Sequence, residues 1–233
     1  MSVSKRANRF VRFAVIFLVL IAIAAVTRRT LVLLWPAQFS GGQSNPAAVL
    51  DAGFARHRAL TLAHILPGAL FLGLAALQFV PSIRKKHLQF HRWSGRFLVA
   101  LGLVIGTTAL IMSYRMNIGG PNETAATTLF AIVFLICLTR AFVLIRRKEV
   151  ARHREWMIRA YAVALGVATT RPIVGMFFAF RRLTPREFFG IAFWVGFTTT
   201  LMAAELWIDY TRQRGVEHTD SAERDRANSV FAA

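Results

Sequence analysis

Residues 125–145 have the sequence AATTLFAIVFLICLTRAFVLI, which contains a single charged side chain, Arg140. An α-helix rises about 1.5 Å per residue, so this stretch is long enough to cross a hydrocarbon core of about 30 Å. An apolar run of this length with so few charges is typical of a transmembrane helix. The stretch therefore predicts that the chain is an integral membrane protein.

Five further apolar runs predict the rest of the fold. They cover residues 13–27, 60–81, 97–114, 156–180 and 188–208. Together the six runs indicate an all-α, polytopic bundle of six transmembrane helices. We expect three parts: an N-terminal signal-anchor helix with an outer loop (1–58), a five-helix membrane core (59–209) and a disordered cytoplasmic tail (210–233).

The first run leaves one alternative open. It is the shortest of the six, it follows four basic residues, and it contains the small-residue segment Ala22 to Ala25. These features also describe a cleavable signal peptide. We favour a retained signal anchor. In the outer loop that follows, we expect the apolar residues 31–35 to lie at the membrane interface.

Composition and charge agree with a membrane protein. Of the 233 residues, 55% are apolar, and 29 Lys and Arg stand against 11 Asp and Glu, a net charge of +18. A cytoplasmic N-terminus would place 19 of the 29 basic residues on the inner side and only eight on the outer side. The positive-inside rule thus predicts a protein of the inner membrane with both termini in the cytoplasm. It also explains the excess of basic residues, so nucleic-acid binding is not needed to account for it.

Several kinds of chemistry lack their sequence motifs. The lone cysteine, Cys137, excludes a disulfide framework and a Cys-x-x-Cys redox pair. The sequence also contains no Gly-rich phosphate loop, no Gly-x-Ser-x-Gly elbow and no His-Glu-x-x-His pair, so hydrolytic and nucleotide-driven activities are not indicated. Catalytic residues are therefore unknown from the sequence.

Two ionisable residues within the apolar runs predict an outer ligand site. Counted along their helices, His64 and Arg171 lie at a similar level in the outer half of the membrane. Arg171 is too far from either end of its run to reach the interface, so it needs an anion or several acceptors. We expect the pair to bind a quinone-like or anionic small molecule. The alternative for His64 is a neutral imidazole bonded to a neighbouring group.

A second candidate site lies near the inner face. His91 and His153 enter two different runs at one depth, and imidazoles on two helices are what axial ligation of a b-type haem requires. Arg96 and Arg159 could then neutralise the haem propionates. The alternatives are ordinary basic loops with histidines, and a His-ligated copper or iron site without porphyrin.

One acid inside the runs has a structural interpretation. Glu205 lies near the inner end of the last run, and we expect it to pair with Arg140 or Arg159. A buried ion pair satisfies both charges without implying a reaction.

The inner residues carry a resemblance to a known family. The motifs His91-Arg92-x-x-Gly95-Arg96 and His153-x-x-Trp156-Met157-Ile158-Arg159 resemble those of the bacterial predicted membrane proteins grouped as domain of unknown function 2306, over about residues 60–180. The resemblance implies a polytopic membrane protein with no settled activity. Its motif residues correspond here to His64, His91, Arg92, Gly95, Arg96, His153, Trp156, Met157, Arg159 and Arg171.

A more distant, architectural likeness is to the di-haem cytochrome b superfamily. It implies a helical core that holds haems through histidine pairs near each face. The sequence departs from that pattern because residues 125–145 contain no histidine. Analogy of fold raises an expectation but does not establish a function.

Two functional hypotheses follow from these residues. The first is a b-type haem-binding protein of transmembrane electron transfer, with His91 and His153 on the haem iron. The second is a non-enzymatic membrane protein that binds or transports a small anionic ligand or lipid at His64 and Arg171. The partners expected are the lipid bilayer and a quinone or anionic small molecule, with no nucleic acid. The oligomeric state is not predicted.

Overall fold

The computed structural model describes residues 3–39, 48–116, 118–180 and 183–231 and confirms the predicted all-α bundle. Within these residues, six helices are long and apolar enough to cross a membrane. They are α1 (Val3–Leu34), α4 (Arg58–Gln78), α6 (Leu88–Arg115), α7 (Gly120–Arg146), α8 (Val150–Phe180) and α9 (Pro185–Phe231). Three short helices connect them: α2 (Pro36–Phe39), α3 (Ala48–Arg56) and α5 (Pro81–Lys86).

Most of the long helices extend beyond the apolar runs that predicted them. Helix α6 begins at Leu88 rather than at residue 97, and α7 begins at Gly120 rather than at 125. An apolar run marks the part of a helix in hydrocarbon, whereas the helix itself continues through the interface, where long basic side chains remain hydrated. Helix α1 likewise continues beyond its apolar run and includes residues 31–34, which were expected at the interface.

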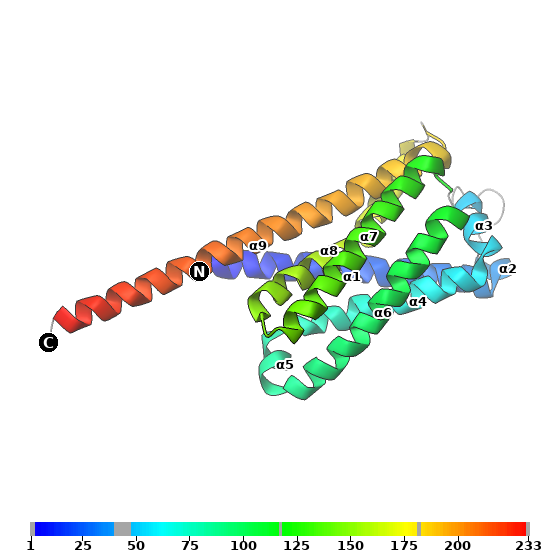
Figure 1. Ribbon diagram of the computed structural model, residues 1–233. Helices are drawn as coiled ribbons and strands as arrows, with labels where there is room; N and C mark the ends of the chain where they lie inside the picture. Colours follow the sequence, from blue (N-terminus) through cyan, green and yellow to red (C-terminus); the bar gives the residue numbers. More distant parts are fainter. Residues whose placement is uncertain (1–2, 40–47, 117, 181–182, 232–233) are drawn as a thin grey trace.

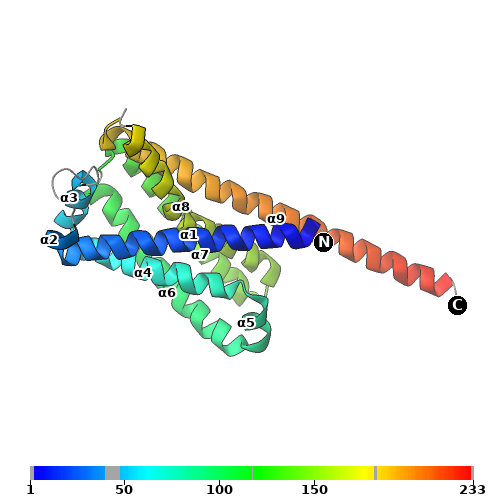
Figure 2. The same cartoon turned by 180° about the vertical axis from the view of Figure 1, so that it is seen from behind.

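Both termini lie at the same end of the bundle (Figures 1 and 2). Helix α5 and the turn between α7 and α8 lie at that end too, whereas α2 and α3 lie at the opposite end. We call the end that carries α2 and α3 the outer end. The arrangement gathers the most basic connections on one side, and that this side is cytoplasmic remains a prediction from the charge distribution.

The C-terminal segment continues the last membrane helix, and a disordered cytoplasmic tail over 210–233 stays a prediction. Helix α9 continues without interruption through residue 210 and ends at Phe231. A helix that is already formed extends at little cost per added residue.

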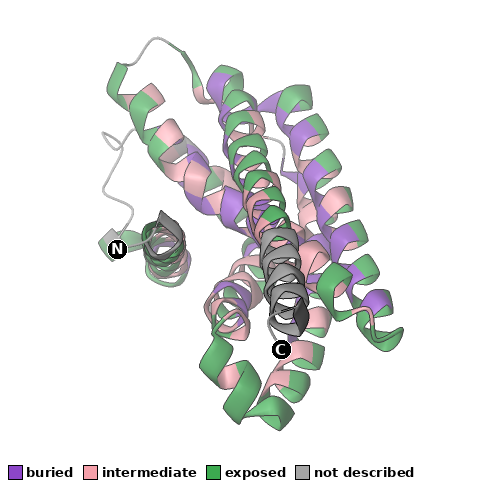
Figure 3. Ribbon diagram, turned by 90° about the vertical axis from the view of Figure 1, so that its left-hand side faces the viewer, coloured by how far each residue is buried: buried purple, intermediate pink, exposed green. Residues whose placement is uncertain are grey.

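Helix α8 is central in the packing. It contacts α1, α4, α7 and α9, while α6 packs on α4 and α7. Glycines allow these close approaches: a side chain at Gly102 or Gly106 would meet leucines of α7. Helix α1 lies at the edge of the bundle (Figure 3), with 6% of its most apolar stretch buried against 39% in α7.

The contact between α8 and α9 allows a packing test. A methyl group on Gly166 would overlap the ring of Phe197, which is itself stacked on Phe130 at 5.0 Å between ring centroids. We expect Gly166→Ala to lower the free energy of unfolding by about 1–3 kcal/mol, the usual cost of overpacking. The matched control is Gly73→Ala, because nothing lies within 4 Å of a methyl group at Gly73. Denaturation in micelles measures both, and equal stabilities would contradict the packing.

Candidate functional site

A cavity of about 180 Å³ lies at the centre of the bundle. All six long helices contribute to its wall, and Phe54 of α3 contributes at the outer end. Most of the wall is aliphatic and aromatic. Five polar side chains interrupt it, and they come from four helices: His64, Ser113, Glu123, Thr127 and Arg171.

The polar side chains gather toward the outer end of the cavity. On α7, Glu123 and Thr127 line it in the first two turns, and Phe134 lines it further in. On α8, Arg171 lies eight residues beyond Val163, which is about 12 Å along a helix. The cavity is therefore polar at its outer end and apolar toward the middle of the bundle.

Arg171 is a cation without a counterion within the described part of the chain. Its Nε is buried and has no hydrogen-bond partner. The charges that act on it most are also positive, since Arg28 and Arg29 lie nearby. Burying an unpaired charge inside a membrane is costly, so this arrangement favours the arrival of an anion.

Thr127 is a second polar group that lacks a partner among the described residues. Its Oγ1 is buried and makes no hydrogen bond. Helical threonines usually bond a carbonyl of their own helix, as Thr108 does with Val104 at 2.7 Å. The sequence provides no signal that Thr127 would behave differently, so it was not among the predicted site residues.

His64 lies in the same cavity wall as Arg171, as the helical rise predicted. Its Nδ1 is 3.0 Å from the Oγ1 of Thr108, and that hydroxyl already donates its hydrogen to Val104. Nδ1 is then the donor in this contact, and on a neutral ring Nε2 would be an acceptor. The contact with Thr108 thus satisfies one of the two ring nitrogens of His64.

Glu123 is an acid that the sequence analysis did not place within the membrane. It is 8% exposed, and its carboxylate accepts a hydrogen bond from the amide of Gly119 at 2.6 Å. It was missed because the apolar run was counted from residue 125, two residues beyond Glu123. Glu123 thus joins Glu205 as an acid within the membrane helices.

An ion cluster fastens α3 over the outer end of the cavity. Asp51 accepts two hydrogen bonds from Arg28, at 3.1 and 2.8 Å, and another from Arg29. The guanidinium of Arg29 lies over the ring of Phe54, 4.1 Å from its centroid. Since Phe54 lines the cavity, this cluster fixes part of the cavity wall.

The comparison with protein families fits this architecture. Residues 61–208 match the family described as Predicted membrane protein (DUF2306). The chain belongs to this family. The match runs from α4 into α9 and leaves out α1, α2 and α3. Neither the curated proteins nor the solved structures yielded a match.

The DUF2306 match extends further than the resemblance seen in the sequence. That resemblance ended near Phe180, whereas the family match includes the membrane part of α9. Helix α9 contributes Phe193 and Phe197 to the cavity. The family region thus supplies five of the helices around the cavity, and α1 with α3 completes its outer wall.

In this DUF2306 protein the two inner histidines lie in the first turns of α6 and α8, His91 on α6 and His153 on α8. The Nδ1 of His153 is 2.8 Å from the carbonyl oxygen of Ala141, an arrangement that leaves Nε2 free for a ligand. The Nδ1 of His91 is buried and has no partner in the described residues. Each imidazole thus keeps one ring nitrogen without a described partner, and ligation of a haem iron by the two stays a prediction.

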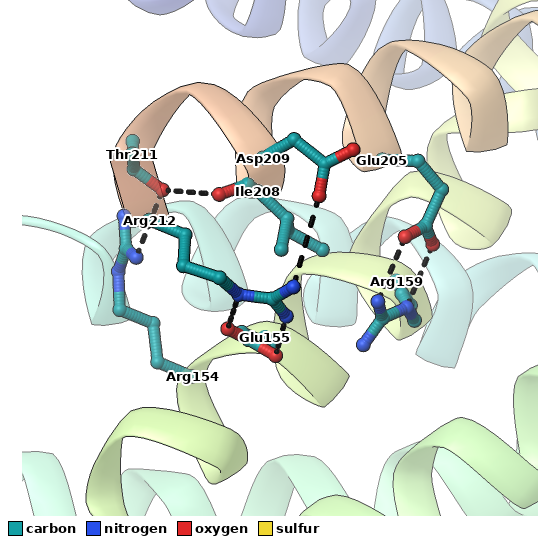
Figure 4. A network of polar contacts seen from close by, with 8 residues as sticks. All are labelled: Arg154, Glu155, Arg159, Glu205, Ile208, Asp209, Thr211 and Arg212. Atoms are coloured by element: carbon teal, nitrogen blue, oxygen red, sulfur yellow. Dashed lines mark hydrogen bonds and ion pairs between the residues drawn. The ribbon is translucent and has the colours of Figure 1, made fainter. Parts of the chain in front are cut away.

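The arginines expected at the propionates are arranged differently. Arg159 forms a bidentate ion pair with Glu205, with both contacts at 2.7 Å (Figure 4). Arg96 is exposed and lies over the ring of Trp93, 5.3 Å from its centroid. The predicted structural pairing of Glu205 is confirmed for Arg159, which is thereby already engaged. Arg140 instead lies over the ring of Trp156, at 5.5 Å.

The described residues contain no group of three or more His, Cys, Asp and Glu side chains that could hold a metal ion. A copper or iron site without porphyrin would therefore have only His91 and His153 as protein ligands in this region.

The unpartnered hydroxyl of Thr127 yields a prediction on stability. Replacing it with a methyl group removes a buried polar atom that makes no described bond, so Thr127→Val should raise the free energy of unfolding by about 1 kcal/mol. Thr170→Val is the control, because Thr170 donates to the carbonyl of Val167 at 2.8 Å and should lose stability. Denaturation of both variants measures the difference, and a loss in Thr127→Val would show that its hydroxyl is satisfied.

Proposed function

We propose that this membrane protein binds a small anionic ligand in its central cavity, with Arg171 as the positive partner. The observation that carries the proposal is the buried Nε of Arg171, which borders the cavity and has no described acceptor. A charged side chain in the middle of a membrane costs about 2.5–3.5 kcal/mol, so such residues are rare unless they are paired or functional. An anion in the cavity would supply the missing pair.

The nearby acids do not take this role in the ligand-free protein. Asp51 is engaged by Arg28 and Arg29, and the carboxylate of Glu123 bonds the amide of Gly119. Arg28 and Arg29 lie near Arg171 and share the single carboxylate of Asp51, so this cluster keeps a net positive charge that adds to the attraction for a negative ligand. The mainly apolar wall favours an anion that also has an apolar body.

We also propose that the protein lies in the cytoplasmic membrane with both termini in the cytoplasm. The excess of basic residues at the end of the bundle that carries the termini supports this orientation. The cavity would then have its polar end toward the outer leaflet.

A pair of probes of nearly equal shape tests the anion proposal. The protein in lipid nanodiscs is titrated with benzoate and with the neutral benzamide, and empty nanodiscs supply the background. We expect benzoate to bind at least tenfold more tightly, because a charge-assisted contact is worth about 1.5–3 kcal/mol. Equal binding of the two probes, or no binding of benzoate, would rule out an anion site.

A haem at His91 and His153 is the second candidate function. The carbonyl contact of His153 and the unpartnered Nδ1 of His91 support it. A bound haem would supply one-electron transfer, and the chain would contribute the two axial ligands. We expect protein purified from haem-sufficient cells to show a reduced b-type spectrum that is lost in both His91→Ala and His153→Ala. A featureless spectrum would contradict this candidate.

A further inference from the structure

The cavity changes in polarity along its length on four helices. Passing inward on α4, the wall changes from His64 to Phe71 and Leu72, and on α8 from Arg171 to Val163. On α6 the wall changes from Ser113 at the outer end to apolar residues further inward. On α7 it changes in the same direction, from Thr127 to Phe134. A ligand that matches this wall has its polar group at the outer end and its apolar part directed inward.

The dimensions of the cavity favour a slender ligand. Its lining residues on α7 extend from Glu123 to Phe134, eleven positions further along, which is about 16 Å on a helix. Its volume is about 180 Å³. An apolar cavity of about 150 Å³ accommodates a ligand the size of benzene. A space of similar volume that is drawn out along the helix axes suits a short flexible chain, and its volume also admits a single ring such as that of benzoate.

The polar groups at the outer end favour a carboxylate as the head. Arg171 offers a donor with a full positive charge, and Thr127 offers a hydroxyl; neither atom has a partner in the described residues. A carboxylate has two acceptor oxygens on one carbon and carries one negative charge, so it can accept from both groups.

We infer that the ligand is a medium-chain monocarboxylate, bound with its carboxylate at Arg171 and Thr127 and its chain extending inward toward Phe134 and Val163. This inference rests on the proposed anion site and adds the chemical class of its ligand. It assigns the outer end of the cavity to charge recognition and the inner end to the alkyl chain.

A chain-length series tests the inference on the unmodified protein. Acetate, butyrate, hexanoate and octanoate are titrated into the protein in nanodiscs, with empty nanodiscs as background. Each buried methylene should tighten binding by about two- to fourfold until the cavity is full. Octanol, which has the chain without the charge, should bind at least tenfold more weakly than octanoate. Butyrate and octanoate of equal affinity would overturn the inference.

Two substitutions on α8 separate the head from the chain. Val163→Phe fills the inner end of the cavity and should weaken octanoate at least tenfold while changing butyrate little. Arg171→Gln should weaken both acids. If Arg171→Gln weakens both but the affinity does not depend on chain length, the anion site stands and the chain inference fails. If octanoate binds Arg171→Gln and the unmodified protein equally, the anion site itself fails.

Discussion

Replacing Arg171 with Met should stabilise the ligand-free protein while abolishing the binding of anions. Methionine has a similar length and no charge, so the substitution removes a cation that has no described counterion and leaves the cavity wall largely filled. An arginine at the centre of a membrane helix costs about 2.5–3.5 kcal/mol, and because Arg171 lies in the outer half the expected gain in the free energy of unfolding is about 1–3 kcal/mol. A change that increases stability and removes binding is typical of a functional site.

The control for this prediction is another arginine of the same helix. Arg159 is paired with Glu205 through two contacts of 2.7 Å, so Arg159→Met leaves a partly buried carboxylate without its partner. Because the side chain of Glu205 is 43% exposed, we expect a modest loss of about 1–2 kcal/mol. Chemical denaturation in micelles compares the two variants. A loss of stability in Arg171→Met would show that the guanidinium is satisfied in the unliganded protein.

The second large effect is expected at Asp51. This carboxylate is 5% exposed and serves both Arg28 and Arg29, so Asp51→Asn leaves two arginines without an acceptor. Breaking a buried ion pair costs about 3–5 kcal/mol, and the partial exposure of Arg28 reduces the expected loss to about 2–4 kcal/mol. The wall contributed by Phe54 should become less ordered, because Arg29 holds that ring.

A surface ion pair provides the control for Asp51. Glu149 pairs with Arg152, whose side chain is 61% exposed, and Glu149→Gln should change the stability by less than about 0.5 kcal/mol. Chemical denaturation measures the stability of both variants. Equal stabilities of Asp51→Asn and Glu149→Gln would show that the ion cluster at α3 is unimportant.

The fold was predictable because membranes impose a simple rule on sequence. Each crossing needs about 20 apolar residues, and the apolar runs marked all six long helices. The ends of those helices were not predictable to the residue, because interfacial residues such as those at the start of α7 are polar and still helical. That limit is the reason Glu123 was overlooked.

Two residues of the candidate site were predictable from their ionisable side chains and their depth in the membrane. His64 and Arg171 were placed together by counting helical rise, and both line the cavity. Thr127 was not, because its lack of a partner depends on where neighbouring helices leave a space. Arg159 was assigned to two alternative partners, a propionate and Glu205, and only the packing of α9 on α8 shows that Glu205 is the contact.

The most direct test of an anion site at Arg171 is a comparison of benzoate binding to three proteins in nanodiscs: the unmodified chain, Arg171→Gln and Arg140→Gln. Arg140 is exposed and lies outside the cavity, so its substitution removes an equal charge from another part of the membrane region. We predict that benzoate binds the unmodified chain and Arg140→Gln alike and binds Arg171→Gln at least tenfold more weakly. Equal binding to all three proteins would contradict the account.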